Sequence, residues 1–208
     1  LIAKVKPYVL FSFLPAISFW VFIFYRQKIT NQFFKTLSLP ITLLLSGFAG
    51  YLLIVKLGQE FSKYSITNAI STAQSFQEYH TSLAENSGAS GYNLGAFDGT
   101  AGGALAKFFP AVNVTLFRPY LWEAGNFIIL ISALESFLLM LLTIRLFVRH
   151  GVTPVFRMLS EKPFILFQLI YTLIFAFAIG FSAYNFGALV RYKIPCLPFF
   201  VACLFELD

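Results

Sequence analysis

The segment FIILISALESFLLMLLTI, residues 127–144, decides the fold, because its eighteen positions hold a single charged side chain, Glu135. About 20 predominantly apolar residues make a helix that crosses the roughly 30 Å hydrocarbon core of a bilayer. We therefore predict a transmembrane helix from Asn126 to Val148. The composition agrees, since the chain is 58% hydrophobic and only 12% charged, against about 25% charged in soluble domains.

Further apolar runs predict an all-α integral membrane bundle of four to five transmembrane helices with a long, partly helical outer loop. The other complete spans are expected at Pro7–Tyr25, Leu37–Val55 and Pro163–Gly187. A fifth run, from Ile194, is too short to cross hydrocarbon and is either the start of a span or a re-entrant piece. The chain thus divides into two helices (1–56), an outer loop (57–125), and two helices with a partial fifth (126–208).

The predicted outer loop contains two kinds of sequence. Its first half carries apolar residues at roughly helical spacing, which predicts an amphipathic helix; they are Phe61, Ile66, Ala69, Ile70, Ala73, Phe76 and Leu83. The stretch SGASGYNLGAFDGTAGG, 87–103, is too rich in glycine for a regular helix or strand. It lacks the Lys-Ser/Thr of a phosphate-binding loop, and Asp98 is its only acid and so its only candidate for a general base.

Positive charge in the short loops sets the expected orientation. Lys and Arg concentrate between the first two spans and between the last two complete spans, at Arg26, Lys28, Lys35, Arg149, Arg157 and Lys162. Loops rich in these residues stay in the cytoplasm. The long loop is then outside, in the periplasm, and we expect a multi-pass protein of a bacterial inner membrane.

The stretch TLFRPYLWEAGN, 115–126, returns the outer loop to the bilayer. Tyr120 and Trp122 suit the headgroup level, where amphipathic rings are favoured. Glu123 would complement the positive end of the following helix, and Asn126 would be its N-cap. Arg118 has two interpretations: it extends to the headgroups as part of this belt, or it binds the phosphate of an anionic headgroup or lipid carrier, since guanidinium binds phosphate with two parallel hydrogen bonds.

Glu135 is the most costly residue of the predicted span, with Ser132 and Ser136 beside it at helical spacing. A lipid-facing, unpaired acid at this depth is disfavoured. The structural interpretation is a hydrogen bond to another helix, with Gln168 as the partner. The functional interpretation is a carboxylate that binds a proton or contacts substrate, and a third is docking to another subunit.

Arg191 and Lys193 flank Tyr192 after the last complete span. They are either ordinary flanking charges or, together with Arg118, a cationic outer pocket for a phosphate-bearing lipid. Cys196 and Cys203 lie seven apart, two helical turns, which favours free buried thiols over a disulfide. No motif indicates a metal site, a cofactor or a nucleic-acid partner.

The segments LFRPYLWEAGN, ISALES and NFGALVRYKIPCLPFF together resemble a loosely defined group of uncharacterised bacterial multi-pass membrane proteins of surface-polysaccharide loci. Proteins of this group have a turn motif directly before a span, which corresponds here to Arg118, Pro119, Trp122 and Glu123. They have a second motif where a later span ends, which corresponds to Asn185, Gly187, Arg191 and Pro195. The layout is also similar to that of multi-pass polysaccharide polymerases, which have a large outer loop and outward-facing arginines.

This resemblance implies a component of bacterial cell-envelope glycan assembly that handles a polyprenyl-phosphate-linked glycan at the outer face of the inner membrane. Arg118, Arg191 and Lys193 would bind the phosphate, and membrane lipid would surround the bundle. Whether the protein is catalytic stays open. The alternative is a non-catalytic accessory or structural subunit of a larger membrane complex, packed against other membrane subunits. A transporter is the third hypothesis, but the inverted repeats typical of transporters are not seen in the sequence.

Overall fold

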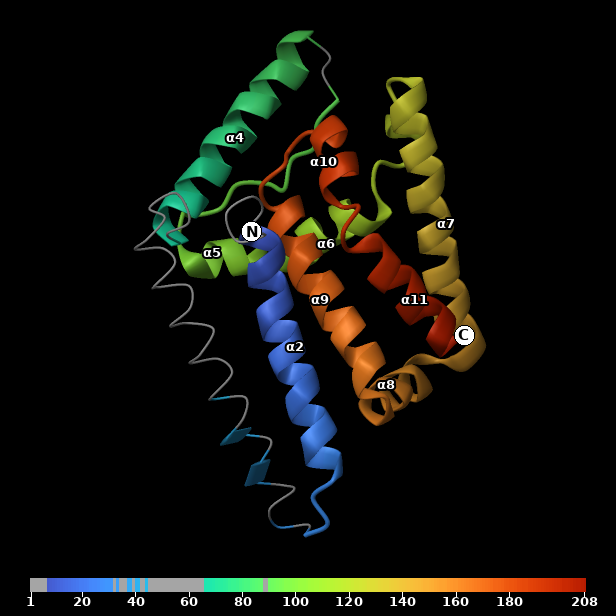
Figure 1. The fold of residues 1–208 in the computed structure, drawn as a ribbon. Helices are drawn as coiled ribbons and strands as arrows, with labels where there is room; N and C mark the ends of the chain where they lie inside the picture. Colours follow the sequence, from blue (N-terminus) through green and yellow to red (C-terminus); the bar gives the residue numbers. More distant parts are fainter. Residues whose placement is uncertain are drawn as a thin grey trace.

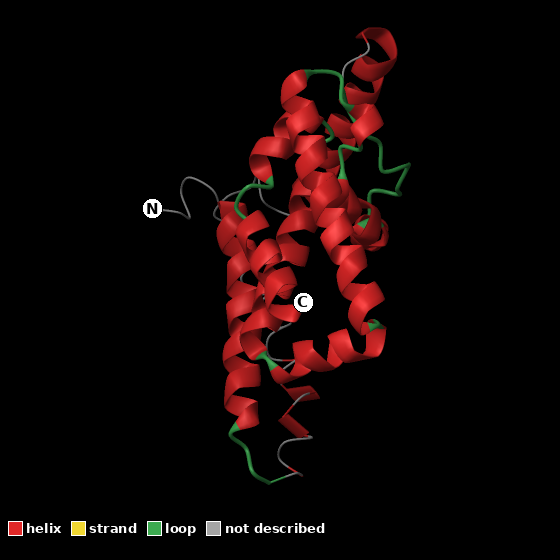
Figure 2. Cartoon of the chain, turned by 90° about the vertical axis from the view of Figure 1, so that its right-hand side faces the viewer, coloured by secondary structure: helices red, strands yellow, loops and turns green. Residues whose placement is uncertain are grey.

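The computed structural model describes residues 7–31, 66–87 and 90–208, together with positions 33, 37, 38, 40, 41 and 44. Within these residues every regular element is a helix (Figures 1 and 2). The predicted second span, Leu37–Val55, lies for the most part outside the described residues. The all-helical fold class is thus confirmed for the part of the chain that is described.

Among the described residues, two helices are long and apolar enough to cross a membrane, α7 (Phe127–His150) and α9 (Pro163–Gly180). At 24 residues α7 is about 36 Å long, which exceeds the hydrocarbon thickness. It begins one residue after the predicted start, and the Asn126 side chain caps it as expected, accepting the backbone N–H of Ile129 at 2.9 Å. The predicted first span forms α2 (Pro7–Gln27), which packs along α9. Its crossing of a membrane stays a prediction.

The predicted end of the fourth span is wrong. The helix ends at Gly180, seven residues before Gly187. The chain then turns through Tyr184, whose carbonyl accepts the Tyr92 N–H at 3.2 Å, and this pairing with a distant segment ends the helix. Two helices follow, α10 (Phe186–Tyr192) and α11 (Leu197–Leu207), bent by 66° at the break between them. This pair is either a third, broken span or a re-entrant loop.

Helix α6 (Phe108–Phe117) packs on α9 within the bundle, although its residues fall in the predicted outer loop, 57–125. Small residues one turn apart make this contact: Ala111 and Thr115 on α6, Ala176 and Gly180 on α9. The Thr115 hydroxyl donates to the Ala176 carbonyl at 2.7 Å. Such pairs of small residues let two backbones approach closely.

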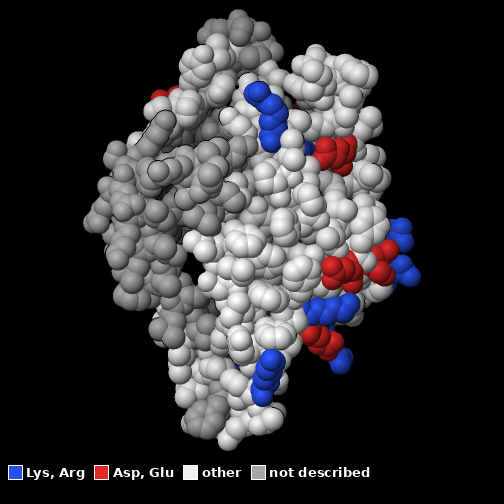
Figure 3. All heavy atoms as spheres, viewed as in Figure 1, with Lys and Arg blue, Asp and Glu red and all other residues white. Residues whose placement is uncertain are grey.

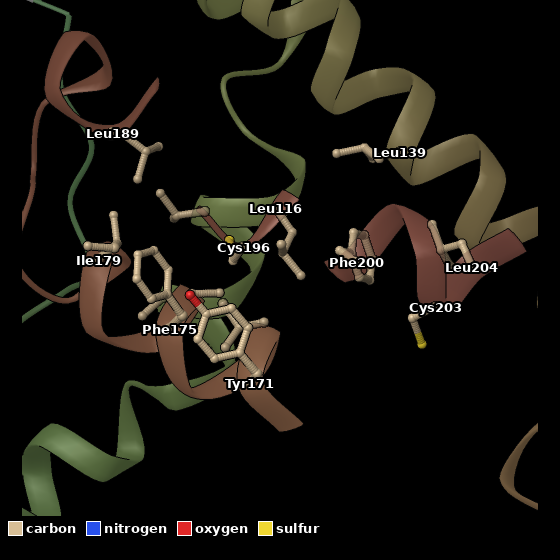
Figure 4. Close-up of a cluster of buried hydrophobic side chains, with 14 of the residues drawn as sticks. Leu116, Leu139, Tyr171, Phe175, Ile179, Leu189, Cys196, Phe200, Cys203 and Leu204 are labelled. Carbon is tan, nitrogen blue, oxygen red and sulfur yellow. The ribbon is translucent and has the colours of Figure 1, made fainter. Parts of the chain in front are cut away.

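The core lies where α6, α7, α9 and α11 meet (Figure 4). Phe13 of α2 packs edge-on against Phe167 and Tyr171 of α9, with ring centroids 5.6 and 5.9 Å apart. Cys196 and Cys203 are buried free thiols, as the sequence predicts.

Helix α4 (Ile66–Ser87) confirms the predicted amphipathic helix in the loop region. Ile70 and Ala73 are buried, whereas Phe76 is exposed. The glycine-rich segment runs beside α4, and Gln77 holds it by donating to the Asn93 side chain at 2.8 Å. The segment is therefore fixed along α4 by amide side chains.

Helix α8 (Val152–Glu161) lies across the ends of α7 and α9 (Figures 1 and 2). The Gln27 side chain donates to the Glu161 carbonyl at 3.1 Å, so the end of α2 reaches the end of α8. The two basic loops therefore lie at one end of the bundle, as the sequence predicts. On the face shown in Figure 3, most charged side chains lie along the right-hand edge, from the middle of the molecule downward, and the centre of the described surface is uncharged.

Asp98 is part of the cap of α5 (Ala101–Ala106). Its carboxylate accepts both the amide and the hydroxyl of Thr100, at 3.0 and 2.7 Å, and the Thr100 hydroxyl in turn accepts the Gly103 N–H. These bonds, the hydroxyl first, lower the pKa of Asp98 below its ordinary value of 3.8. The carboxylate is thus engaged in a helix cap, which leaves the general-base role without support.

This arrangement predicts an acid-dependent opening at the start of α5. Because the pKa of Asp98 is lower in the folded protein, its stabilising effect is complete above pH 3.8 and is lost as the pH falls through the folded pKa. Hydrogen exchange of the Thr100 amide, corrected for the intrinsic rate, should accelerate only in that acid range. In Asp98→Asn this acid-dependent change should be absent, and an identical acid profile in that variant would contradict the assignment.

Candidate functional site

The turn between α6 and α7 places Arg118, Tyr120 and Glu123. Arg118 is the C-cap of α6, and a short 3₁₀ helix, η2 (Leu121–Glu123), follows. Glu123 folds back so that its carboxylate binds the Arg118 guanidinium through both nitrogens of the fork and accepts the Tyr120 N–H at 2.8 Å. The carboxylate was expected to complement the start of α7. It is instead committed to this turn, because a cation and a free amide lie within its reach.

Arg118 is enclosed by aromatic rings. Its guanidinium carbon lies 5.3 Å from the ring centroid of Phe186, 5.6 Å from that of Tyr120 and 6.0 Å from that of Tyr92. These distances suit cation–π attraction. Tyr120 belongs to the same turn as Arg118, whereas Tyr92 comes from the glycine-rich segment and Phe186 from α10. Two distant segments therefore meet the turn at one cation, whose side chain is 19% exposed.

A hydroxyl connects this turn to a second cation. Ser136 of α7 donates to the Arg118 carbonyl at 3.1 Å and accepts a hydrogen bond from the Lys193 ammonium at 2.8 Å. Lys193 is the C-cap of α10 and is completely buried. The break between α10 and α11 is therefore joined to the α6–α7 turn through one serine.

Glu135 supplies the only carboxylate found near Lys193 among the described residues. Its oxygen lies 3.9 Å from the Lys193 nitrogen, an ion pair without a short hydrogen bond, and the Glu135 side chain is 43% exposed. An acid in the middle of a span costs about 2.5–3.5 kcal/mol on insertion scales. A nearby buried cation offsets part of that cost.

The expected hydrogen bond between Glu135 and Gln168 does not form. The Gln168 amide donates instead to Glu206 of α11, at 3.4 Å. The two residues lie at different depths: Gln168 is five residues from the start of α9, at the end of the bundle where α7 ends, whereas Glu135 lies in the opposite half of α7. Ser132 is buried beside Ser136, and its hydroxyl has no hydrogen-bond partner among the described residues.

The remaining predicted residues lie at the surface. Trp122 is 82% exposed and stacks on Tyr120 with ring centroids 4.9 Å apart, an arrangement that suits the interface belt. Arg191 is exposed and donates to its own helix at the Gly187 carbonyl, 3.0 Å away. Arg118 and Lys193 are thus joined through Ser136, whereas Arg191 is on the solvent or lipid side of the same short helix that carries Lys193 at its end.

Sequence reasoning missed two residues of the site, Tyr92 and Phe186. The Tyr92 hydroxyl donates to the Gly180 carbonyl at 2.9 Å, and burial raises the pKa of this tyrosine, so it stays a neutral donor. No local pattern marks either residue, because each reaches Arg118 only through the tertiary fold.

The arrangement is a polar cluster of two cations, two carboxylates and a serine, which we call the Arg118–Lys193 cluster (Arg118, Glu123, Glu135, Ser136 and Lys193). Its guanidinium fork matches a carboxylate or a phosphate. In the described part of the chain, no three His, Cys, Asp or Glu side chains are grouped to hold a metal. Comparisons with protein-family models, with curated proteins and with solved structures find no match.

Proposed function

We propose that this chain is a component of bacterial cell-envelope glycan assembly that handles a polyprenyl-phosphate-linked glycan at the outer face of the inner membrane. The observation that supports this proposal is the Arg118 fork, held by three rings, in a residue whose backbone carbonyl is joined to buried Lys193 through Ser136. The cluster is near the end of α7 away from the basic loops, which is the outer end under the positive-inside rule.

In this proposal Glu123 holds the position of the anion. Its carboxylate occupies both nitrogens of the Arg118 fork, and a lipid phosphate would replace it there, because both ligands offer two oxygens in one plane. Lys193 would add a second positive charge behind the serine. Arg191, exposed on α10, would meet the remaining charge of a diphosphate or headgroup, and Trp122 would lie against the lipid interface.

Binding of polyprenyl phosphate by the purified protein in lipid nanodiscs tests the proposal. Arg118→Lys keeps the cation but removes the two-bond fork, and we expect the affinity for polyprenyl phosphate to fall about tenfold, a difference of about 1.4 kcal/mol. Polyprenol without the phosphate should bind equally to both proteins. Equal binding of the phosphate by wild type and Arg118→Lys would contradict the proposal.

A cellular test compares two exposed arginines, one at each end of the helical bundle. Arg191→Ala should reduce the amount or length of the surface glycan, because it removes charge next to the proposed phosphate site. Arg157→Ala is the matched control, since it removes the same charge from α8 at the opposite end, where Arg157 forms an exposed pair with Glu161. Unchanged glycan in Arg191→Ala, with normal membrane levels, would favour the accessory-subunit alternative.

A further inference from the structure

The side of α7 around Glu135 faces away from the bundle. Glu135 is the ninth residue of α7, about 12 Å along the helix axis from its first residue. It therefore lies within the hydrocarbon, in the half nearer the α6–α7 turn. Ile131 and Leu138, one turn away on the same side, are 54% and 56% exposed. We call these three residues the Glu135 face.

The carboxylate on this face is incompletely bonded. Lys193 lies 3.9 Å away and gives its hydrogen bond to Ser136 instead. In the ranges that the structure describes, no group donates a hydrogen bond to Glu135. Lipid tails carry no donors, so the exposed part of the carboxylate needs a polar group from elsewhere.

We propose that the Glu135 face docks a transmembrane helix of a partner protein, which donates a hydrogen bond to Glu135 from a hydroxyl, amide or cationic side chain. Interhelical hydrogen bonds of this kind hold membrane helices together. The apolar residues Ile131 and Leu138 would pack against the partner helix on either side of the bond. The docking surface is the exposed side of Glu135 with Ile131 and Leu138, whereas the proposed phosphate site is centred on Arg118.

A second copy of the chain fits this face poorly. A two-fold contact places the same surface on both sides. Apart from Glu135, every exposed side chain of α7 between residues 127 and 144 is hydrocarbon; these are Phe127, Ile128, Leu130, Ile131, Leu134, Phe137, Leu138, Leu141 and Ile144. Two copies that met α7 to α7 would therefore set carboxylate against carboxylate or against hydrocarbon, which favours a partner of different sequence.

Photocrosslinking in native membranes tests this interface. A benzoyl-phenylalanine at Leu138 should give one discrete protein adduct, whose mapped site lies in a transmembrane segment that carries a donor. The same probe at Phe164, which is 52% exposed on α9, should not give that adduct. Substitution of the mapped donor by Leu should lower the adduct yield about tenfold, as expected for one interhelical hydrogen bond.

Two variants of this chain complete the test. The double variant Glu135→Leu with Lys193→Met removes the carboxylate together with its buried counter-charge, and Ile131→Trp adds bulk to the exposed face without touching the core. Each should lower the adduct yield about tenfold. An adduct with a second copy, adducts with lipid alone, or a yield that neither variant changes would overturn the proposal. If Ile131→Trp loses the adduct but still binds polyprenyl phosphate normally, the docking surface and the phosphate site are separate.

Discussion

Gly180→Ala is expected to unfold the protein at a temperature roughly 10 °C lower than wild type. A Cβ at this position would lie 2.1 Å from the Ala111 carbonyl oxygen, 2.6 Å from the Thr115 hydroxyl and 2.8 Å from the Ala111 carbonyl carbon. Two of these are backbone atoms of α6 and cannot rotate away. Overpacking a core costs about 1–3 kcal/mol and sometimes more, and about 3 kcal/mol corresponds to a shift of this size in a chain of about 200 residues.

The measurement is thermal unfolding of the purified protein in detergent, followed by circular dichroism. Gly125→Ala is the matched control, because a Cβ there would have no atom within 4 Å. The new methyl group in Gly180→Ala also displaces the carbonyl that accepts the Tyr92 hydroxyl, which adds to the loss. Equal unfolding temperatures for the two variants would mean that α6 and α9 are not in close backbone contact.

Helix α7 was predictable from the sequence because its signals are local. A long apolar run and a capping asparagine lie within one segment, and the predicted span from Asn126 to Val148 matches the observed helix to within two residues. The free thiols and the amphipathic α4 were predicted for the same reason. Each depends only on spacing along one helix.

The contact between α6 and α9 could not be predicted in this way. Hydropathy does not distinguish a helix that packs on another backbone from one that faces lipid. The informative signal was the pair of small residues one turn apart on each helix, Ala111 with Thr115 and Ala176 with Gly180. The end of α9 was missed because apolar residues continue past Gly180, while the helix ends where Tyr184 pairs with Tyr92.

The candidate site likewise contains one contact that follows from local sequence and one that depends on the tertiary fold. The pairing of Arg118 with Glu123 spans five residues and follows from the local turn. The bond between Ser136 and Lys193 spans 57 residues, and it exists only because the α10–α11 break meets α7. The sequence indicates that Ser136 and Lys193 are unusual. It does not predict the break between α10 and α11 that brings Lys193 to α7, and the expected partner of Glu135 was therefore Gln168.

Removal of Glu135 alone is expected to destabilise the protein more than removal of Lys193 alone. In Glu135→Leu the Lys193 ammonium, completely buried, loses its neighbouring carboxylate. Breaking a fully buried ion pair from one side costs about 3–5 kcal/mol, and we expect a loss toward the lower end of that range, because Glu135 is 43% exposed and Ser136 keeps its hydrogen bond to Lys193. In Lys193→Met the remaining charge belongs to Glu135, whose side chain is 43% exposed, so we expect a smaller loss. The free energy of unfolding of each variant, measured by denaturant titration in mixed micelles, gives the comparison.

The double variant should recover most of the loss. Replacing both members of a buried ion pair by apolar residues of similar volume is often neutral. Here only Lys193 is fully buried, and Leu and Met both suit the surrounding hydrocarbon. The resulting coupling energy should exceed about 1 kcal/mol. The exposed pair of Arg157 and Glu161, four residues apart on α8, is the control cycle, with an expected coupling of about 0.3–0.5 kcal/mol.

Additive losses in the first cycle would show that Glu135 does not neutralise Lys193. The ammonium would then depend on Ser136 alone, and the connection from Lys193 to the Arg118 carbonyl would be a hydrogen-bonded link without a charge pair. A phosphate site needs positive charge at Lys193, and that charge is retained at this depth only if a carboxylate stays beside it. The coupling energy of the pair therefore decides whether the second cation of the Arg118–Lys193 cluster is available to an anionic ligand.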